Sequence, residues 1–247
     1  MWSSERSEDA VGMRAMILAA GRGTRLGELG RTVPKVLVDV GGEPLLARQI
    51  AYLKDNGIER IVINAHHLAE QIEEFVANHP AAADITVVRE SELLGTAGGV
   101  RNALELLGSE PFVVLYGDVI VAEPIAPIAA AHTSSDACAT LTLYRSSDIE
   151  GKGTVELESA NGGQVIVAFH EKTVAHADRQ AYVNAGLYVV DPDLIAGLPA
   201  GVALDFGHDV FPDALSRERT LAAHVLQAPV IDMGTPAMLD AARAQLS

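Results

Sequence analysis

Cysteine is nearly absent from this sequence: Cys138 is the only one among 247 residues. One cysteine cannot build an intramolecular disulfide framework or a cysteine-based metal cluster, and this suits the reducing cytoplasm, where we expect the protein to be. No apolar run is long enough to cross a membrane. Residues 1–12 are polar and lack the apolar core of a secretory signal. We interpret them as a flexible leader, with Met13 as a candidate native start.

Positive charge is also scarce, because 18 Lys and Arg residues face 33 Asp and Glu residues, a formal net charge of −15. This balance argues against nucleic acid or an anionic membrane as a partner. It does not exclude a small anionic substrate. To bind one, the chain would have to gather its few cations at one place and recruit a divalent metal ion.

Apolar strands and amphipathic helices alternate along the first part of the chain. Strands are predicted at 14–19, 60–65, 85–89, 112–116 and 137–145, and helices at 43–56, 68–78, 98–107 and 125–132. This order predicts an α/β fold with a doubly wound, mostly parallel, Rossmann-like sheet. In such sheets ligands bind beyond the carboxyl ends of the strands. The glycine-rich loop after the first strand and Asp118 after the fourth both fall there.

The pattern changes after about residue 145. The segments 153–157 and 164–170 flank Asn161-Gly162-Gly163 and predict a β-hairpin, and a further strand is expected at 182–190. We therefore predict a smaller mixed β lobe over the crevice. Residues 13–247 would form a single domain, with one lobe at about 13–145, a second at about 146–232 and a C-terminal helix at 235–246.

The segment Gly21-Arg22-Gly23-Thr24-Arg25 after the first strand does not fit the better-known glycine motifs. Leu26 occupies the place of the third glycine of a dinucleotide fingerprint, which argues against a nicotinamide-dependent Rossmann enzyme, and no Gly-Lys-Ser/Thr triplet forms a P-loop. His170-Glu171 lacks the second histidine of a zinc protease, since residue 174 is Val. What remains is a group of four cations, Arg22, Arg25, Arg31 and Lys35. Glycine amides and arginine forks bind phosphate oxygens, so we favour a phosphate site over a solvated basic turn.

A series of motifs in this order resembles the sugar-1-phosphate nucleotidylyltransferase family. The motifs are Met16-Ile-Leu-Ala-Ala-Gly-Arg-Gly-Thr-Arg-Leu26, Pro34-Lys35, Gly42-Glu-Pro-Leu-Leu46, Leu94-Gly-Thr-Ala-Gly-Gly99, Gly117-Asp118, Gly153-Thr-Val-Glu-Leu157, Phe169-His-Glu-Lys172, Asn184-Ala-Gly186 and Asp232-Met-Gly-Thr-Pro236. The resemblance covers about residues 13 to 245. The resemblance implies an enzyme that transfers a nucleoside monophosphate from an NTP to a sugar 1-phosphate and releases pyrophosphate.

The resemblance also implies roles for particular residues. Arg25 and the loop amides would hold the β- and γ-phosphates, Lys35 would steady the α-phosphate, and Asp118 and Asp232 would bind Mg²⁺, which suits paired carboxylates. Arg25, Lys35, Asp118 and Lys172 are the expected catalytic residues. The expected nucleotide-binding residues are Leu18, Ala19, Ala20, Gly21, Gly23, Thr24, Arg25, Lys35, Glu90, Gly95, Thr96, Ala97 and Gly117.

The sugar would contact Glu171, Lys172, Asn184 and Gly186 by the same resemblance. Neighbouring residues of a regular strand point to opposite faces, so Glu171 and Lys172 can both serve only at a strand end or a bulge. Lys172 is therefore the stronger candidate of the two.

The base is less well defined by the sequence. A carboxylate in the segment 90–99, from Glu90 or Glu92, accepts hydrogen bonds only, and guanine, uracil and thymine offer a ring N–H to it. We expect GTP with heptose or mannose 1-phosphate, because the motifs at 153–157, 169–172 and 231–236 resemble those of the guanylyltransferases that use these sugars. The alternatives are a uridylyltransferase acting on an amino-sugar such as N-acetylmuramate 1-phosphate, and a catalytically silent nucleotide-sensing homologue. A homo-oligomer is compatible with the sequence.

Overall fold

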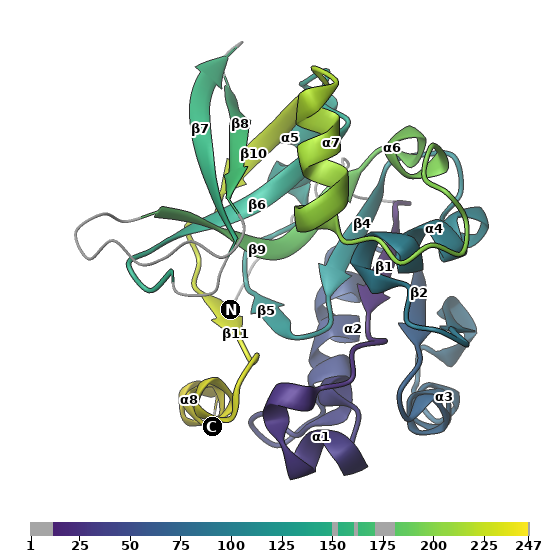
Figure 1. Ribbon diagram of the computed structural model, residues 1–247. Coiled ribbons are helices and arrows are strands. Elements are labelled where there is room, and N and C mark those ends of the chain that lie inside the picture. The colour runs from purple at the N-terminus through teal and green to yellow at the C-terminus, as the bar shows by residue number, and fades with distance from the viewer. Residues whose placement is uncertain (1–11, 150–152, 161–162, 171–180, 247) are drawn as a thin grey trace.

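The computed structural model describes residues 12–149, 153–160, 163–170 and 181–246, and its core is one continuous β-sheet (Figure 1). Within those residues, nine strands run in the order β3-β2-β1-β4-β9-β6-β10-β8-β7. Their bounds are β1 Arg14–Leu18, β2 Arg60–Ala65, β3 Ile85–Arg89, β4 Phe112–Tyr116, β6 Ala139–Ser146, β7 Thr154–Ala160, β8 Gly163–His170, β9 Ala181–Val190 and β10 Leu221–Val225. A separate two-stranded sheet pairs β5 (Val119–Val121) with β11 (Val230–Asp232).

The first four strands of the sheet are parallel to one another. The expected doubly wound arrangement is therefore confirmed, and the helices on its two faces are α2 (Leu45–Asp55) and α3 (Ala69–Ala77) on one side and α4 (Gly95–Leu107) on the other. Strand β1 alternates between these faces, since Ala15 and Ile17 join one core cluster and Met16 joins the other. Burial on both faces is typical of parallel sheets and explains the unbroken apolar run of β1.

The second half of the chain extends the same sheet. Strand β9 lies antiparallel between β4 and β6, with Leu115 paired to Leu187. The predicted hairpin is confirmed as β7 and β8, and the mixed lobe adds strands to the edge of the parallel sheet. Because β9 runs opposite to β4, its earlier residues lie beside the carboxyl end of β4, where ligands are expected.

Helix α4 begins at Gly95, three residues earlier than the apolar pattern predicted. Its first turn is rich in glycine, which is a weak helix former. The apolar residues that reveal the helix in the sequence begin only at Val100. The turn is instead fixed by tertiary contacts: the amides of Ala97 and Gly98 donate to the carbonyl of Leu204, at 2.9 and 3.1 Å. These amides would otherwise lack partners at the start of the helix.

Two further helices lie close to where the sequence predicted them, α5 (Ala126–Thr133, predicted as 125–132) and α8 (Pro236–Leu246, predicted as 235–246). Four short elements were not predicted: α1 (Glu28–Thr32), α6 (Pro192–Ala196), a π-helical turn Phe206–Val210 and α7 (Phe211–Ser216). Helix α8 packs through Leu239 and Ala242 against Val38, Val40 and Leu45. The end of the described chain thus touches the segment that follows the glycine-rich loop 19–25, which we call the phosphate loop after its expected role.

Cys138 is buried, as expected of a small apolar side chain in a strand region, and its thiol donates to the carbonyl of Thr220. Burial also raises the pKa of this thiol. Among the described helices none is both long enough and apolar enough to cross a bilayer.

Candidate active site

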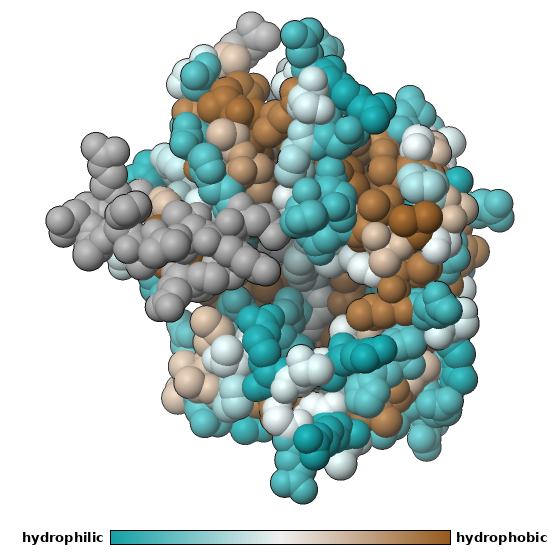
Figure 2. All heavy atoms as spheres, viewed as in Figure 1, coloured by the Kyte–Doolittle hydropathy of each residue, from teal (hydrophilic) through white to brown (hydrophobic). Residues whose placement is uncertain are grey.

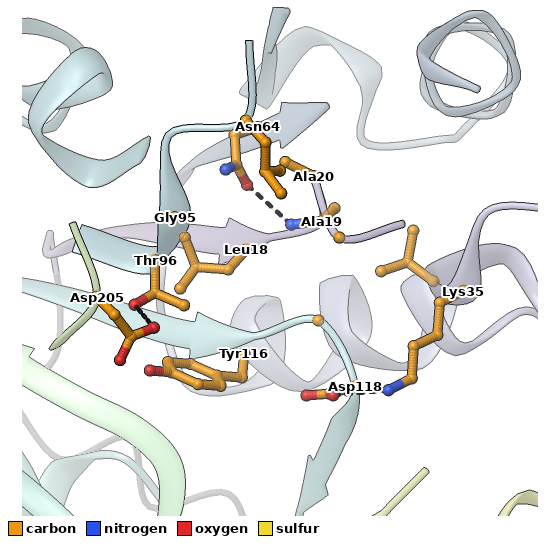
Figure 3. A pocket seen from close by; sticks show the side chains of 14 residues that line it. Leu18, Ala19, Ala20, Lys35, Asn64, Gly95, Thr96, Tyr116, Asp118 and Asp205 are labelled. Atoms are coloured by element: carbon orange, nitrogen blue, oxygen red, sulfur yellow. Dashed lines mark hydrogen bonds and ion pairs between the residues drawn. The ribbon is translucent and has the colours of Figure 1, made fainter. Parts of the chain in front are cut away.

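A hollow lies beyond the carboxyl ends of β1, β2 and β4, where the sequence predicted the nucleotide (Figure 3). We call it the nucleotide hollow, and it is lined by Leu18, Ala19, Ala20, Gly21, Lys35, Val36, Asn64, Leu93, Gly95, Thr96, Tyr116, Gly117, Asp118 and Asp205. Most of these residues come from the end of β1 and the phosphate loop, from the start of α4 and from the end of β4. The structure thus brings together segments that are distant in the sequence.

The backbone of the phosphate loop is held by glycines. Gly23 has a positive φ of 60°, which favours glycine. Gly30 of α1 packs against this residue so closely that a Cβ at Gly30 would lie 2.3 Å from the carbonyl oxygen of Gly23. Helix α1 is therefore fixed on the outer side of the loop, and a larger residue at position 30 would push the two apart.

A buried polar network anchors the loop to the neighbouring strands. The side-chain oxygen of Asn64, at the end of β2, accepts from the amide of Ala19 at 2.8 Å, as Figure 3 shows. Its amide nitrogen donates to Glu90 Oε1 at 2.7 Å, and Glu90 Oε2 accepts from the amide of Leu94 at 3.1 Å. Glu90 is only 4% exposed. The carboxylate predicted to meet the base is therefore already engaged in joining the phosphate loop to the start of α4.

This network leads to a reciprocal test. Asn64→Asp removes the donor to Glu90 and sets two carboxylates against each other, and we expect a loss of about 1–3 kcal/mol in the free energy of unfolding with a raised KM for NTP. Glu90→Gln in the same chain supplies a donor to the new aspartate and keeps an acceptor for Leu94. The double variant should recover most of the loss, as measured by denaturant unfolding in a double-mutant cycle. Additive losses would show that the two side chains are not coupled.

Lys35 and Asp118 meet at the other end of the nucleotide hollow. Lys35 Nζ lies 2.7 Å from Asp118 Oδ2, and their side chains are only 14% and 28% exposed. Asp118 follows Gly117, where a Cβ would lie 2.3 Å from the carbonyl oxygen of Leu18. Glycine is therefore required for the end of β4 to lie against β1, and this contact sets the position of Asp118 next to the phosphate loop.

Asp232 is brought to the same point by the small sheet. Strands β5 and β11 pair Asp232 with Val119, and the amide of Met233 donates to the carbonyl of Asp118 at 2.9 Å. Burial, and then the nearby Asp118 carboxylate, raise the pKa of Asp232. Arg25 also reaches this place. Its Nη1 lies close to Gly234, two residues after Asp232, because a Cβ added to Gly234 would lie 3.2 Å from it.

The two carboxylates fit a divalent cation. Burial and mutual repulsion oppose the ionisation of Asp232, and a bound cation would reverse that preference. Mg²⁺ commonly binds through one or two carboxylates and keeps the rest of its shell for water and substrate phosphates. No group of three or more histidine, cysteine, aspartate or glutamate side chains suited to a metal occurs in the described part of the chain. The fit therefore depends on Asp118 and Asp232 alone.

A second hollow, the sugar-side hollow, shares Tyr116, Asp118 and Asp205 with the first. Its other lining residues are Arg25, Val119, Tyr144, Gly153, Phe169, Val183, Asn184, Gly186, Gly207, Asp232, Thr235 and Met238. The Asn184 side chain accepts from the amide of Gly186 at 3.0 Å and donates to the hydroxyl of Tyr188. Gly186 has a positive φ of 73°, and a Cβ there would lie 3.0 Å from the ring of Tyr116. Glu171 and Lys172 lie outside the described residues.

Asp205 borders both hollows and was not among the predicted site residues. Its Oδ2 accepts from the hydroxyl of Thr96 at 2.7 Å (Figure 3), and its Oδ1 accepts from the amide of Gly207 at 2.9 Å. The Thr96 hydroxyl in turn accepts from the amide of Phe206 at 2.9 Å. The sequence carried a local signal for the turn alone, because aspartate is a common N-cap residue, and none for the contact with Thr96.

The comparisons with known proteins agree with this geometry. A family model described as nucleotidyl transferase matches residues 14–247. The chain belongs to this family. Among solved structures, HddC from Yersinia pseudotuberculosis superposes with a TM-score of 0.81 at 24% identity, over 95% of this chain and 100% of that one. The complex of HddC with GMP-PN gives a TM-score of 0.79 at 26% identity. The fold predicted from the sequence is confirmed by this likeness.

Curated relatives of this chain differ in the base that their names specify. It is 28% identical over 235 residues to a UTP–glucose-1-phosphate uridylyltransferase of Synechocystis, covering 90% of this chain and 60% of the relative. It is 31% identical over 229 residues to a mannose-1-phosphate guanyltransferase of Schizosaccharomyces pombe, covering 91% and 61%. The corresponding enzyme of Mycobacterium tuberculosis is 31% identical over 224 residues, covering 90% and 61%. The chain thus spans about 60% of the length of these relatives.

Proposed function

We propose that this chain is a sugar-1-phosphate nucleotidyltransferase that transfers NMP from an NTP to a sugar 1-phosphate and releases pyrophosphate. The observation that carries this proposal is the meeting of Lys35, Asp118, Asp232 and Arg25 at the border between the two hollows. A transferase of this kind needs two substrates side by side with their phosphates at one point. Cations at that point offset the charge of the two phosphates, and the carboxylates suit a metal ion.

In the proposed reaction, a phosphate oxygen of the sugar 1-phosphate attacks the α-phosphorus of the NTP. The bond from the α-phosphorus to the bridging oxygen breaks, and its electron pair leaves with pyrophosphate. Phosphoryl-transfer enzymes act mainly by positioning and charge stabilisation. We assign Lys35 to the α-phosphate and the amides of Gly21 to Thr24 to the phosphates that follow it. Arg25, which the sequence resemblance assigns to the β- and γ-phosphates, we assign to the reacting phosphates instead, because it lies near Asp232. A Mg²⁺ ion held by Asp118 and Asp232 would neutralise negative charge on the phosphates.

The remaining site assignments follow the family motifs. We propose that Leu18, Ala19, Ala20, Gly95, Thr96, Ala97 and Gly117 surround the nucleoside, and that Asn184, Gly186, Glu171 and Lys172 contact the sugar. By this proposal residues 13–145 hold the nucleotide and residues 146–232 hold the sugar. Helix α8 is the last element of the same domain. The location of most of these residues around two adjoining hollows supports the division.

For the base and the sugar we propose GTP with mannose or heptose 1-phosphate. The support is the 31% identity to mannose-1-phosphate guanylyltransferases and the likeness to HddC in complex with GMP-PN. The uridylyltransferase relative at 28% identity favours the second candidate, UTP with a hexose or amino-sugar 1-phosphate.

The test is a matrix of reactions. Purified protein with Mg²⁺ is incubated with each NTP and with mannose, glucose, heptose and N-acetylmuramate 1-phosphates, and pyrophosphate release is followed. GTP with mannose or heptose 1-phosphate should give the highest kcat/KM. A preference for UTP would overturn the choice of base only. Tight NTP binding without release from any pair would overturn the enzyme proposal and favour a silent nucleotide-binding homologue.

A further inference from the structure

The two carboxylates proposed for Mg²⁺ lie at one end of the small sheet of β5 and β11, which we call the ribbon (Figure 1). Three residue pairs join its strands, and Asp232 is paired with Val119, directly after Asp118. Two strands of this length are marginally stable by themselves. The separation of Asp118 from Asp232 therefore depends on what keeps the two strands in this register.

The apolar residues of the ribbon do not specify the register. Val119, Val121 and Val230 join one core cluster, and Ile120 and Ile231 join another. All five are β-branched, so a slipped strand would exchange one aliphatic contact for another. The second cluster is covered by α1 and α8, and the surface over α1 is largely hydrophilic (Figure 2). Packing thus holds the ribbon in place, and directional polar contacts are needed to fix its register.

Such contacts occur at the end of the ribbon away from the two aspartates. Glu123, two residues after β5, accepts through Oε2 from the amide of Gln227 at 2.6 Å and from that of Ala228 at 3.1 Å. These two residues lead into β11. Glu123 Oε1 lies 2.9 Å from His224 Nε2, in β10, which donates to it. The carboxylate thus continues the pairing where the backbone ladder stops, and it joins the ribbon to the main sheet.

The Glu123 side chain is itself firmly held. It is 13% exposed, and that of His224 is 20% exposed. Burial opposes ionisation, but the hydrogen bonds from His224 and from the two loop amides outweigh it and lower the pKa of Glu123. Its backbone carbonyl accepts from the hydroxyl of Tyr52, in α2, at 2.7 Å. Glu123 is therefore a fixed point from which the start of β11 is positioned.

We propose that Glu123, supported by His224, is a positioning residue for the metal site, because its carboxylate sets the register of β11 on β5. The register in turn sets the separation of Asp118 from Asp232. This rests on the proposed function, in which these two aspartates bind Mg²⁺. Glu123 acts from the opposite end of the ribbon and through the backbone. Its role requires the reach to span two amides and an imidazole, and not its negative charge as such.

The test separates reach from charge. Glu123→Asp keeps the charge, but it is one methylene shorter and cannot reach the loop amides and His224 together. Glu123→Gln keeps the length: its oxygen can accept from the amides, and its NH₂ group can donate to the other tautomer of His224. Mn²⁺, which prefers the same oxygen ligands as Mg²⁺, is titrated into each protein without nucleotide. Free Mn²⁺ is measured by electron paramagnetic resonance.

We expect Glu123→Asp to raise the Kd for Mn²⁺ about tenfold, because groups that orient metal ligands contribute about 10–100-fold to metal affinity. Glu123→Gln should stay within about twofold of the unchanged protein by the same reasoning. Asp118→Asn identifies the bound ion, since Mn²⁺ at the proposed site should be lost in that variant.

Asp191→Ala is the matched control. Asp191 forms a similar pair with His132, whose Nε2 lies 3.2 Å from its Oδ1. It follows β9 at the edge of the sheet away from Asp118, because Val190 pairs with Phe112 at the start of β4. Its loss should lower the free energy of unfolding and leave the Kd for Mn²⁺ unchanged.

The register can also be measured without metal. The amide of Met233 donates to the carbonyl of Asp118 at 2.9 Å, so hydrogen exchange in the segment 230–234 reports whether the ribbon is paired. Exchange in the metal-free protein should be faster in Glu123→Asp than in Glu123→Gln or Asp191→Ala.

Three outcomes would overturn the proposal. The first is an unchanged Kd in Glu123→Asp. The second is an equal loss of affinity in Asp191→Ala, which would show that the effect is one of general stability. The third is a loss confined to Glu123→Gln, which would show that the charge attracts the metal from a distance. Failure of the proposed function is distinguishable from these, because the unchanged protein would then bind no Mn²⁺ that Asp118→Asn removes.

Discussion

Asp118→Asn should lower the rate of pyrophosphate release by about 10²–10³, or roughly 3–4 kcal/mol in the barrier. The substitution keeps the size of the side chain but removes one of the two negative charges available to Mg²⁺. It also removes the ion pair that holds Lys35 Nζ 2.7 Å from Asp118 Oδ2. Lys35 would then lose its fixed position beside the reacting phosphates. The measurement is kcat for the best NTP and sugar 1-phosphate pair at saturating Mg²⁺.

The same variant should remain folded. The lost ion pair with Lys35 is partly exposed, and its loss is offset by the relief of repulsion between Asp118 and Asp232. We expect the free energy of unfolding to change by less than about 1 kcal/mol. Asp55→Asn, at the exposed end of α2, is the matched control and should leave both rate and stability unchanged. An Asp118→Asn protein with full activity would remove this carboxylate from the mechanism.

Phe211→Ala should destabilise the fold by about 3–5 kcal/mol, as expected for truncation of a buried aromatic side chain. Phe211 is 0% exposed and lies between two other buried rings. Its centroid is 5.2 Å from that of Phe206 in a stacked pair and 5.3 Å from that of Tyr188 in an edge-to-face pair. This aromatic cluster holds the π-helical turn 206–210 against β9. Denaturant unfolding monitored by circular dichroism gives the change.

The cluster also fixes Asp205, which directly precedes the turn. We therefore expect Phe211→Ala to raise KM for both substrates, because Asp205 borders both hollows. Phe211→Leu is the control. It keeps most of the volume and should cost less than about 1.5 kcal/mol, with KM unchanged. A Phe211→Ala protein with wild-type stability would show that this part of the core collapses without a cavity.

Much of the fold was readable from the sequence because its strands and helices carry strong periodic patterns. Strands β2, β3 and β4 begin and end where the apolar pattern placed them. β2 and β4 are short runs of mostly buried residues, and β3 is a half-buried strand at the edge of the sheet, so local composition and tertiary environment agree. The position of Asp118 followed from the same reasoning, since it comes directly after β4.

Other parts of the site depend on contacts that no local pattern encodes. Glu90 was expected to face the base, yet its carboxylate accepts from Asn64 and Leu94, 26 residues before it and four after it. Asp205 was missed because its partner Thr96 is 109 residues away. The pairing of β5 with β11, which brings Asp232 to Asp118, joins two three-residue strands that are too short to show alternation.

The order of strands has a consequence for how specificity changes among such proteins. The phosphate loop follows β1, Asp118 follows β4, and Asn184 lies in β9, and these are three consecutive strands of one hydrogen-bonded sheet. Neighbouring strands lie about 4.8 Å apart, so the backbone fixes the separation of the phosphate loop, Asp118 and Asn184. By the assignments proposed above, the base contacts lie on one side of this group, around β2 and the start of α4, and the sugar contacts begin in β9 at its other edge. On that proposal we expect substitutions to exchange one base for another, or one sugar for another, independently and without moving the reacting atoms.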